Sequence, residues 1–249
     1  MKAVSVLRYR ESGDSWDSWH RPENVRFHVT NRIGGASASP YDSFNLAGHV
    51  GDLAKSVRAN RESLKKFLSL EHSPIWLEQI HSTEILSIGA NKSGIDLPQA
   101  DGAYTTELQR PLVVMTADCM PILICSRDGQ EIAAVHAGWR GLASGIIERA
   151  VNKFSSDKLL VYLGPTIDVC HYEIGEQVRE NFTTSDAFKP SHRAGHWMFD
   201  MYEEARRQLR ALGVHSVTAS KHCTYCDKNL FSYRRENRTG RFASLIWLE

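Results

Sequence analysis

Short apolar runs of the kind that form β-strands recur along the whole chain and constrain its fold more than any other feature. Nine such runs cover residues 25–30, 75–80, 84–88, 112–117, 121–125, 131–136, 159–163, 214–219 and 243–248. Three other segments carry apolar residues at helical spacing, namely 54–69, 141–154 and 199–212. Strands mixed with fewer helices predict an α/β or α+β fold with mixed sheets. No linker or break in composition divides the chain, so we expect a single domain over residues 1–249, with residues 1–24 partly irregular.

Composition narrows the class of protein further. An apolar content of 42% in 249 residues excludes a disordered chain and supplies a core that needs no disulfides, so the five cysteines are expected to be reduced thiols. A net charge of +1 gives no electrostatic reason to expect nucleic acid or an anionic membrane as a partner. The longest apolar stretches, 111–125 and 131–139, are interrupted by Asp118, Arg127 and Asp128, and the N-terminal apolar run is too short for a signal peptide. We therefore expect a cytoplasmic globular protein.

Three of the apolar runs end in residues that bind metals. The segments WLEQIH, TADCMP and VHAGWRG bring His81, Cys119 and His136 to the ends of predicted strands. Two imidazoles and one thiolate suit zinc and leave a fourth position open for water or substrate. Two other interpretations stay open: Cys119 as a nucleophile with His136 or His81 as its base, or two ordinary histidines and a buried thiol. The long gaps between these residues, without a compact ligand motif, favour the last interpretation on spacing alone.

Other candidate motifs are weaker. Cys223 and Cys226 form a lone CxxC, and without a second pair we do not expect a zinc knuckle. His192 and His196 are four residues apart, but the neighbouring glycine and proline indicate a loop rather than a metal-binding helix. The basic run 233–241 is either a solvated turn or a clamp for phosphate or carboxylate. Neither a GxGxxG nor a GKS pattern accompanies the glycine-containing loops, so a Rossmann or P-loop nucleotide site is not supported.

A set of short motifs follows in order along the chain. These are RIGG (32–35), PYDSFNL (40–46), GD (51–52), NR (60–61), WLEQIH (76–81), TADCMP (116–121), VHAGWRG (135–141), LGP (163–165), CT (223–224), SYRR (232–235) and TGR (239–241). Over about residues 25–249 this set resembles the family described as laccase-domain proteins, multicopper polyphenol oxidases, peptidoglycan editing factors or purine nucleoside phosphorylases. The departures are small: Ala36 follows the glycine pair where the family usually has valine, and Cys226 is treated as incidental.

The resemblance implies a fold and a metal site. It implies one domain of mixed sheets sandwiched between helices, with an architecture related to that of cysteine-dependent toxin hydrolases. It also implies that His81, Cys119 and His136 bind zinc and form the catalytic centre, with copper as the alternative metal. The zinc tripod thereby becomes the main interpretation of these three residues.

The resemblance also implies an activity on small molecules. Its members are described as phosphorolysing adenosine, inosine, guanosine and methylthioadenosine, and as deaminating adenosine, so a purine nucleoside and phosphate are the expected partners. One alternative is an amidase that edits peptidoglycan precursors with the same zinc or the Cys119 thiol; another is a metal-dependent binding protein without a catalytic role. A copper polyphenol oxidase is disfavoured, because no two of the 11 histidines form the His-x-His pairs of a multicopper cluster. The sequence leaves open whether the protein is a monomer or a homodimer.

Candidate substrate contacts lie in the loops that carry these motifs. We expect an anion or a nucleoside to be bound by four polar side chains, Arg32, Asn45, Arg61 and Gln79. The arginines between Arg234 and Arg241 are further candidates for phosphate. Asp118, next to the proposed ligand Cys119, is expected to orient a ligand.

Overall fold

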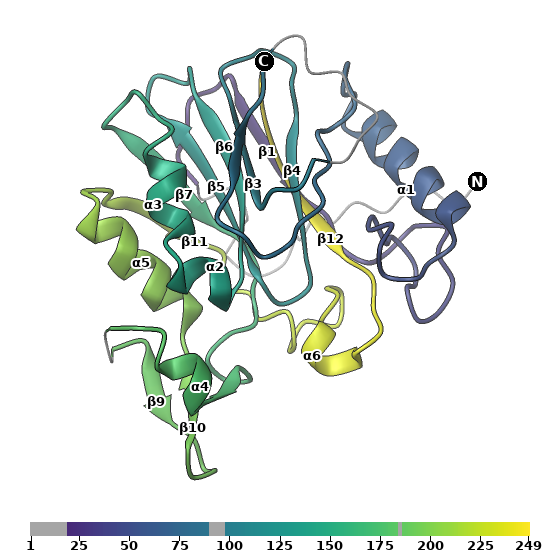
Figure 1. Cartoon of the computed structure of the whole chain (residues 1–249). Coiled ribbons are helices and arrows are strands. Elements are labelled where there is room, and N and C mark those ends of the chain that lie inside the picture. The colour runs from purple at the N-terminus through teal and green to yellow at the C-terminus, as the bar shows by residue number, and fades with distance from the viewer. Residues whose placement is uncertain (1–18, 90–97, 184–185) are drawn as a thin grey trace.

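The computed structural model describes residues 19–89, 98–183 and 186–249, in which two packed sheets lie between two layers of helices (Figure 1). The larger sheet is mixed and has the strand order β11-β7-β5-β6-β3-β2. Its strands are β2 (Ile85–Ser87), β3 (Gly102–Thr105), β5 (Met120–Ser126), β6 (Ile132–Ala137), β7 (Leu159–Leu163) and β11 (Ser216–Ala219). The predicted class, a single α+β domain with mixed sheets between helices, is confirmed.

A second, antiparallel sheet packs on one face of the first. It has the order β1-β12-β4, with β1 at Val25–Val29, β12 at Phe242–Leu248 and β4 at Leu112–Thr116. Helices α2 (Trp139–Ala143), α3 (Ile146–Val151) and α5 (Met201–Ala211) cover the free face of the larger sheet, and α1 (Ala54–Phe67) covers the smaller one. The layer order is therefore helix, sheet, sheet, helix.

The alternating direction of the side chains along the central strands explains this layering. In β5, Ile122 and Ile124 face the core beneath α2, α3 and α5, whereas Leu123 and Cys125 face the second sheet. Because side chains on a strand point alternately to opposite faces, a run that is apolar at every position is buried on both sides. Strands β4 and β12 are buried in the same way, between the larger sheet and α1.

Two of the predicted elements are wrong. The run 75–80 forms only isolated bridges at Ile75 and Glu78 instead of a strand. The helix expected over 141–154 is divided into α2 and α3, because Gly145 adopts a left-handed conformation with φ of 84° that ends one helix and precedes the next. The other predicted strands and helices are confirmed with boundaries shifted by a few residues.

A small lobe and a short helix complete the described chain. The lobe contains the sheet β8-β10-β9, with β8 at Glu173–Gly175, β9 at Phe188–Pro190 and β10 at His196–Phe199, together with α4 (Glu176–Arg179). Helix α6 (Tyr233–Glu236) lies below β12, at the lower end of the sheets in Figure 1. His192 and His196 belong to this lobe, so the loop predicted around them is in part a strand.

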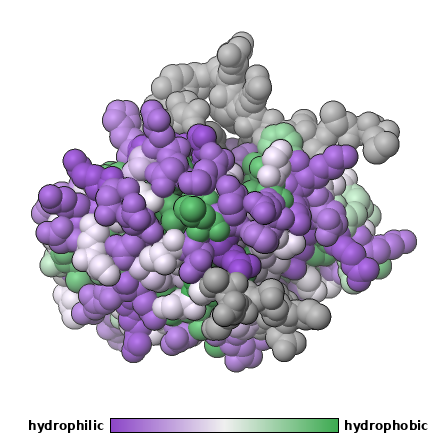
Figure 2. Space-filling model, turned by 90° about the horizontal axis from the view of Figure 1, so that it is seen from above, coloured by the Kyte–Doolittle hydropathy of each residue, from purple (hydrophilic) through white to green (hydrophobic). Residues whose placement is uncertain are grey.

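The surface carries no broad apolar area on the face seen in Figure 2. Hydrophilic side chains cover most of that face, and the apolar ones form small separate patches. Within the described part of the chain, no helix combines the length and the hydropathy needed to cross a membrane. The irregular segment predicted before β1 lies largely outside the described residues.

Candidate metal centre and active site

Three strand ends meet where the metal ligands were predicted. Strand β4 ends at Thr116, and after a short turn Cys119 directly precedes β5. His136 lies near the end of β6, which pairs with β5 so that Pro121 is opposite His136. His81 comes from the loop before β2. The antiparallel register of β5 and β6 therefore explains why Cys119 and His136, 17 positions apart, come together.

The donor atoms of these three residues are close enough for one metal ion. The ligand atoms of His81, Cys119 and His136 all lie within 4.8 Å of one another, and Cys119 Sγ is 3.9 Å from His81 Nε2. Zinc in tetrahedral coordination, with bonds of about 2.3 Å to sulfur and about 2.0 Å to nitrogen, holds such atoms about 3.5 Å apart. The fold brings one cysteine sulfur and two imidazole nitrogens together at nearly this separation. These donors are of the type that zinc prefers, so the set fits zinc.

A buried carboxylate that the sequence analysis missed positions two of the three ligands. Asp101 is fully buried, and its Oδ1 accepts hydrogen bonds from His136 Nδ1 at 2.8 Å and from the His81 backbone N–H at 3.0 Å. Its Oδ2 accepts from the Ser82 backbone and hydroxyl at 2.5 and 2.8 Å. A ligating histidine that donates its other nitrogen to a carboxylate is held in one tautomer and one orientation. Asp101 therefore leaves Nε2 of His136 for a metal.

Two residues of the site have an unusual backbone conformation. His81 has φ of 60° and Asp118 has φ of 95°, in the left-handed region that residues other than glycine rarely adopt. Such conformations cost about 1–3 kcal/mol each and persist only when the surroundings hold them. Asp101 holds the turn at His81, and at Asp118 the carboxylate accepts hydrogen bonds from Thr224 Oγ1 and the Arg234 backbone N–H, both at 2.6 Å. Asp118 thus braces the cavity wall, and the predicted task of orienting a ligand falls to Asp101 instead.

The thiol and the buried imidazole alter each other's protonation. Burial opposes ionisation of Cys119, yet the charge on His136 and hydrogen bonds from His136 and His81 outweigh it and lower the thiol pKa to about 6. For His136, burial is again the opposing effect, and the Cys119 thiolate and the Asp101 carboxylate raise the pKa to about 9. The pocket therefore stabilises a thiolate, the form in which cysteine binds a metal or attacks an electrophile.

Gly138 leaves the space that the sulfur occupies. A Cβ atom at this position would lie 2.9 Å from Cys119 Sγ and 3.2 Å from His81 Cδ2. The glycine of the HAGWRG segment is thus explained by the close approach of two ligands to the backbone. Any larger side chain here must displace one of them.

The tripod opens into a cavity of about 470 Å³. Its walls include three arginines, Arg140, Arg234 and Arg241. They also include three aromatic side chains, Trp139, Tyr172 and Tyr233, and the polar residues His49, Gln79 and Asp118. The cavity is therefore large enough for a small organic ligand. Its cationic and aromatic groups are paired, because each of the three guanidiniums lies over one of the three rings, at 4.5–5.8 Å from the ring centre.

The predicted substrate contacts are only partly brought together. Gln79 lines the cavity, but its amide makes two hydrogen bonds of 2.8 Å with the Met115 backbone. Arg234 and Arg241 of the basic run line it as expected.

Arg32, Asn45 and Arg61 lie outside the residues that line the cavity. Arg32 Nη1 is 2.6 Å from Glu236 Oε1, and the buried Asn45 amide is bonded within its own loop and to the Arg241 backbone. The guanidinium of Arg61 stacks on Trp76 at 3.8 Å from the ring centre. Their role in binding substrate stays a prediction.

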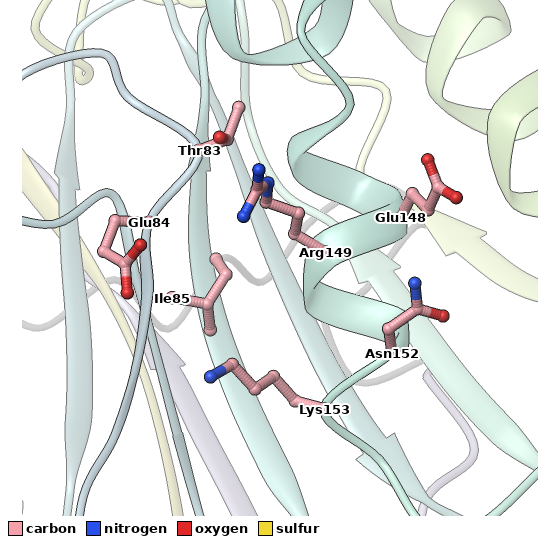
Figure 3. A pocket seen from close by; sticks show the side chains of 7 residues that line it. All are labelled: Thr83, Glu84, Ile85, Glu148, Arg149, Asn152 and Lys153. Atoms are coloured by element: carbon pink, nitrogen blue, oxygen red, sulfur yellow. The ribbon is translucent and has the colours of Figure 1, made fainter.

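A second, more open hollow of about 530 Å³ lies between β2 and α3 (Figure 3). Arg149 and Lys153 extend from the helix side toward Thr83 and Ile85. Its walls contain no histidine or cysteine, and it contacts none of the predicted site residues. The predicted metal ligands therefore line the first cavity and not this one.

Comparison with known proteins agrees with this geometry. Residues 26–249 match the family model described as multi-copper polyphenol oxidoreductase laccase. The chain belongs to this family. It is 41% identical over 239 residues to a purine nucleoside phosphorylase of Pseudomonas aeruginosa, covering 93% of this chain and 96% of the relative. It is 40% identical over 236 residues to purine nucleoside phosphorylase YfiH of Escherichia coli K12, covering 92% and 96%.

Solved structures of relatives share the fold. The crystal structure of Neisseria meningitidis protein NMB0706 superimposes with a TM-score of 0.86 at 39% identity, covering 92% of this chain and 96% of that one. YlmD from Geobacillus stearothermophilus gives a TM-score of 0.86 at 28% identity, covering 91% and 93%. The order of elements around the tripod is therefore that of an experimentally observed fold.

Proposed function

We propose that this protein is a zinc-dependent purine nucleoside phosphorylase whose active site is the cavity at the tripod. The observation that carries the proposal is the combination of a metal-ligand tripod with three cavity arginines and three aromatic rings. Phosphorolysis needs an anion site for phosphate, a surface for the purine and stabilisation of the charge that develops on the ribose. The names of the relatives point to the same reaction.

The arginines are suited to hold phosphate. Among the described residues, none of Arg140, Arg234 and Arg241 has a carboxylate partner within 4 Å, so their charges are not neutralised by ion pairs there. Guanidinium groups bind phosphate oxygens through paired, charge-assisted hydrogen bonds. They would orient the phosphate for attack on the ribose carbon that carries the base.

The remaining cavity residues are suited to the nucleoside. The rings of Trp139, Tyr172 and Tyr233 offer faces on which a purine can stack. Burial, followed by the charges of Arg241 and Arg61, lowers the pKa of His49, which keeps its ring neutral and able to accept a hydrogen bond from a ribose hydroxyl. Adenosine, inosine, guanosine and methylthioadenosine are the proposed substrates.

Zinc held by His81, Cys119 and His136 would supply Lewis-acid chemistry to an oxygen brought into the cavity. Asp101 keeps His136 oriented. When phosphate is absent, the same site is proposed to deaminate adenosine to inosine. A copper enzyme of the multinuclear type fits poorly, because neither of the two His/Cys groups found among the described residues contains more than two histidines.

The test is direct. Zinc-loaded protein is incubated with adenosine and phosphate, and products are separated by chromatography; adenine and ribose 1-phosphate are expected, and inosine when phosphate is omitted. A muramyl amino-acid precursor is the competing substrate, and its hydrolysis with no nucleoside turnover would establish the amidase alternative. Equal activity of metal-free and zinc-loaded protein would favour Cys119 acting as a nucleophile and would refute the zinc mechanism.

A further inference from the structure

A second group of metal ligands lies outside the tripod. Cys170 and His171 belong to the segment between β7 and β8, and Cys223 and Cys226 to the loop after β11. The three sulfurs and one ring nitrogen of these residues all lie within 4.8 Å of one another. The lone CxxC of the sequence therefore has a partner pair, Cys-His, supplied from 53 residues earlier in the chain.

The separations match those in a tetrahedral zinc site. Cys170 Sγ is 3.8 Å from Cys223 Sγ and 3.9 Å from Cys226 Sγ. His171 Nδ1 is 3.1 Å from Cys170 Sγ and 3.3 Å from Cys226 Sγ. Zinc–ligand bonds of about 2.3 Å to sulfur and about 2.0 Å to nitrogen place sulfurs about 3.8 Å apart and a nitrogen about 3.5 Å from each sulfur. The sulfur–sulfur separations are also nearly twice the length of a disulfide bond, which is about 2.05 Å.

The backbone already orders the two loops around these side chains. The Asp168 N–H points at Cys223 Sγ at 3.4 Å, the type of outer-shell hydrogen bond that a ligating thiolate accepts. The imidazole of His171 stacks on Tyr225 with ring centres 4.2 Å apart. Thr166 and Cys223 form a parallel bridge that joins the two segments. The ligands are thus held in place by contacts other than a metal.

We propose that Cys170, His171, Cys223 and Cys226 bind a structural zinc ion. Three thiolates and one imidazole fill all four tetrahedral positions, so no place remains for a substrate, in contrast to the three-ligand tripod. Cys170 and Cys226 are exposed, which gives a metal ion a route of entry. This site is independent of the proposed phosphorolysis. With the tripod zinc, it gives an expected content of two zinc ions per chain.

The ion would fasten the wall of the active-site cavity. Tyr172, a cavity residue, directly follows His171. Thr224, which directly follows Cys223, donates its hydroxyl to the Asp118 carboxylate. Loss of the second zinc is therefore expected to loosen the wall, lowering Tm and raising KM for nucleoside while leaving the tripod able to bind its metal.

The experiment counts zinc and identifies its ligands. Wild-type protein and variants are loaded with excess zinc, desalted and analysed for metal per chain. Two zinc ions are expected in the wild type and one in each of Cys226→Ser, Cys170→Ser and Cys119→Ala. Cys125→Ala, which removes a thiol buried in β5 away from both sites, is the matched control and should keep two.

X-ray absorption at the zinc edge separates the two sites. The zinc that remains in Cys119→Ala should have three sulfur neighbours at about 2.3 Å and one nitrogen at about 2.0 Å. The zinc that remains in Cys226→Ser should have one sulfur neighbour. Zinc in Cys119→Ala with one sulfur or none, or no zinc at all in that variant, would overturn the proposal.

Two further outcomes would also overturn it. One is full wild-type zinc content in both Cys226→Ser and Cys170→Ser. The other is a chain that is two hydrogens lighter because two of these sulfurs form a disulfide in freshly prepared protein. If the second zinc is found but no phosphorolysis occurs, only the proposed function fails; if phosphorolysis occurs and Cys226→Ser keeps all its zinc, only the second site fails.

Discussion

Asp101→Asn tests how the protein holds its metal ligands. The carboxylate is fully buried and accepts hydrogen bonds from His136 Nδ1 and from the backbone of Ile80, His81 and Ser82, at 2.5–3.2 Å. An asparagine keeps one acceptor oxygen and turns the other position into an NH₂ group, which then faces an N–H donor. The substitution therefore weakens both the orientation of one ligand and the strained turn that carries another.

The size of the effect follows from these contacts. Loss of a carboxylate behind a ligating histidine costs 10–100-fold in metal affinity, or about 1.4–2.7 kcal/mol. A buried donor left without an acceptor costs about 1–3 kcal/mol of folding stability. In a chain of this length a loss of about 2 kcal/mol lowers Tm by about 4–8 °C. Both losses are expected for Asp101→Asn.

The assay is a competition between the protein and a chromophoric zinc chelator, carried out on chains that also carry Cys226→Ser so that the tripod dominates. Glu131→Gln is the matched control: it makes the same carboxylate-to-amide change at a buried side chain that accepts hydrogen bonds from Tyr104 and from the Ser155 and Ser156 backbone, and none of its hydrogen bonds involves a ligand of the tripod. We expect less than a twofold change in zinc affinity for the control. Wild-type affinity in Asp101→Asn, or a larger loss in Glu131→Gln, would refute the reasoning.

Three other substitutions probe the site and the fold. Gly138→Ala should displace the Cys119 sulfur and reduce the amount of bound zinc. Gly48→Ala, in which no atom lies within 4 Å of the added Cβ, is the control and should keep wild-type zinc content and Tm. Equal zinc content in both variants would contradict the packing explanation of Gly138. Arg140→Met and Arg241→Met should each raise KM for phosphate about tenfold or more at unchanged zinc content, because each removes a charged hydrogen bond to phosphate. An unchanged KM in both variants would exclude the two arginines as phosphate contacts. Burial lowers the pKa of His28 to about 4, so the unfolded chain takes up a proton that the folded chain refuses as pH falls from about 6.5 to about 4. The Tm of the wild type should therefore fall more steeply over that range than the Tm of His28→Leu, and parallel curves would contradict this assignment.

Local patterns were sufficient to predict most of the larger elements. Strands such as β5 and β12 are apolar at every position, and the faces of α1 and α5 repeat at helical spacing, so propensity and burial point the same way. Strand β3 was missed because Gly102-Ala103-Tyr104-Thr105 is short and begins with two small residues. It is a strand because it pairs with β6, a long-range contact that no local window contains.

Local sequence patterns contain no long-range contacts, and this also decides which parts of the site were predicted and which were missed. His81, Cys119 and His136 stand in motifs at strand ends and could be grouped by residue type and resemblance. Asp101 has no motif of its own and reaches His136 only through the register that places Gly102 opposite Val135. Asp118 was predicted because it is next to Cys119 in sequence, but its carboxylate accepts hydrogen bonds from Thr224 and Arg234 and from none of the three ligands.

The lone CxxC illustrates the same point for the second cluster. Cys223 and Cys226 lack a nearby second pair in sequence, and the prediction against a zinc knuckle rested on that absence. The parallel pairing of β11 with β7 carries the two following loops to the same place, and Cys170 and His171 arrive there with them. Topology, rather than sequence spacing, assembles this group of ligands.

The central claim is that the tripod metal is required for nucleoside phosphorolysis. The most direct measurement is to add zinc back stepwise to metal-free protein and to follow the release of adenine from adenosine in the presence of phosphate. The account predicts that activity is absent without metal, rises in proportion to zinc bound at His81, Cys119 and His136, and does not return in Cys119→Ala at any zinc concentration. Full turnover by the metal-free protein, or by zinc-loaded Cys119→Ala, would contradict it.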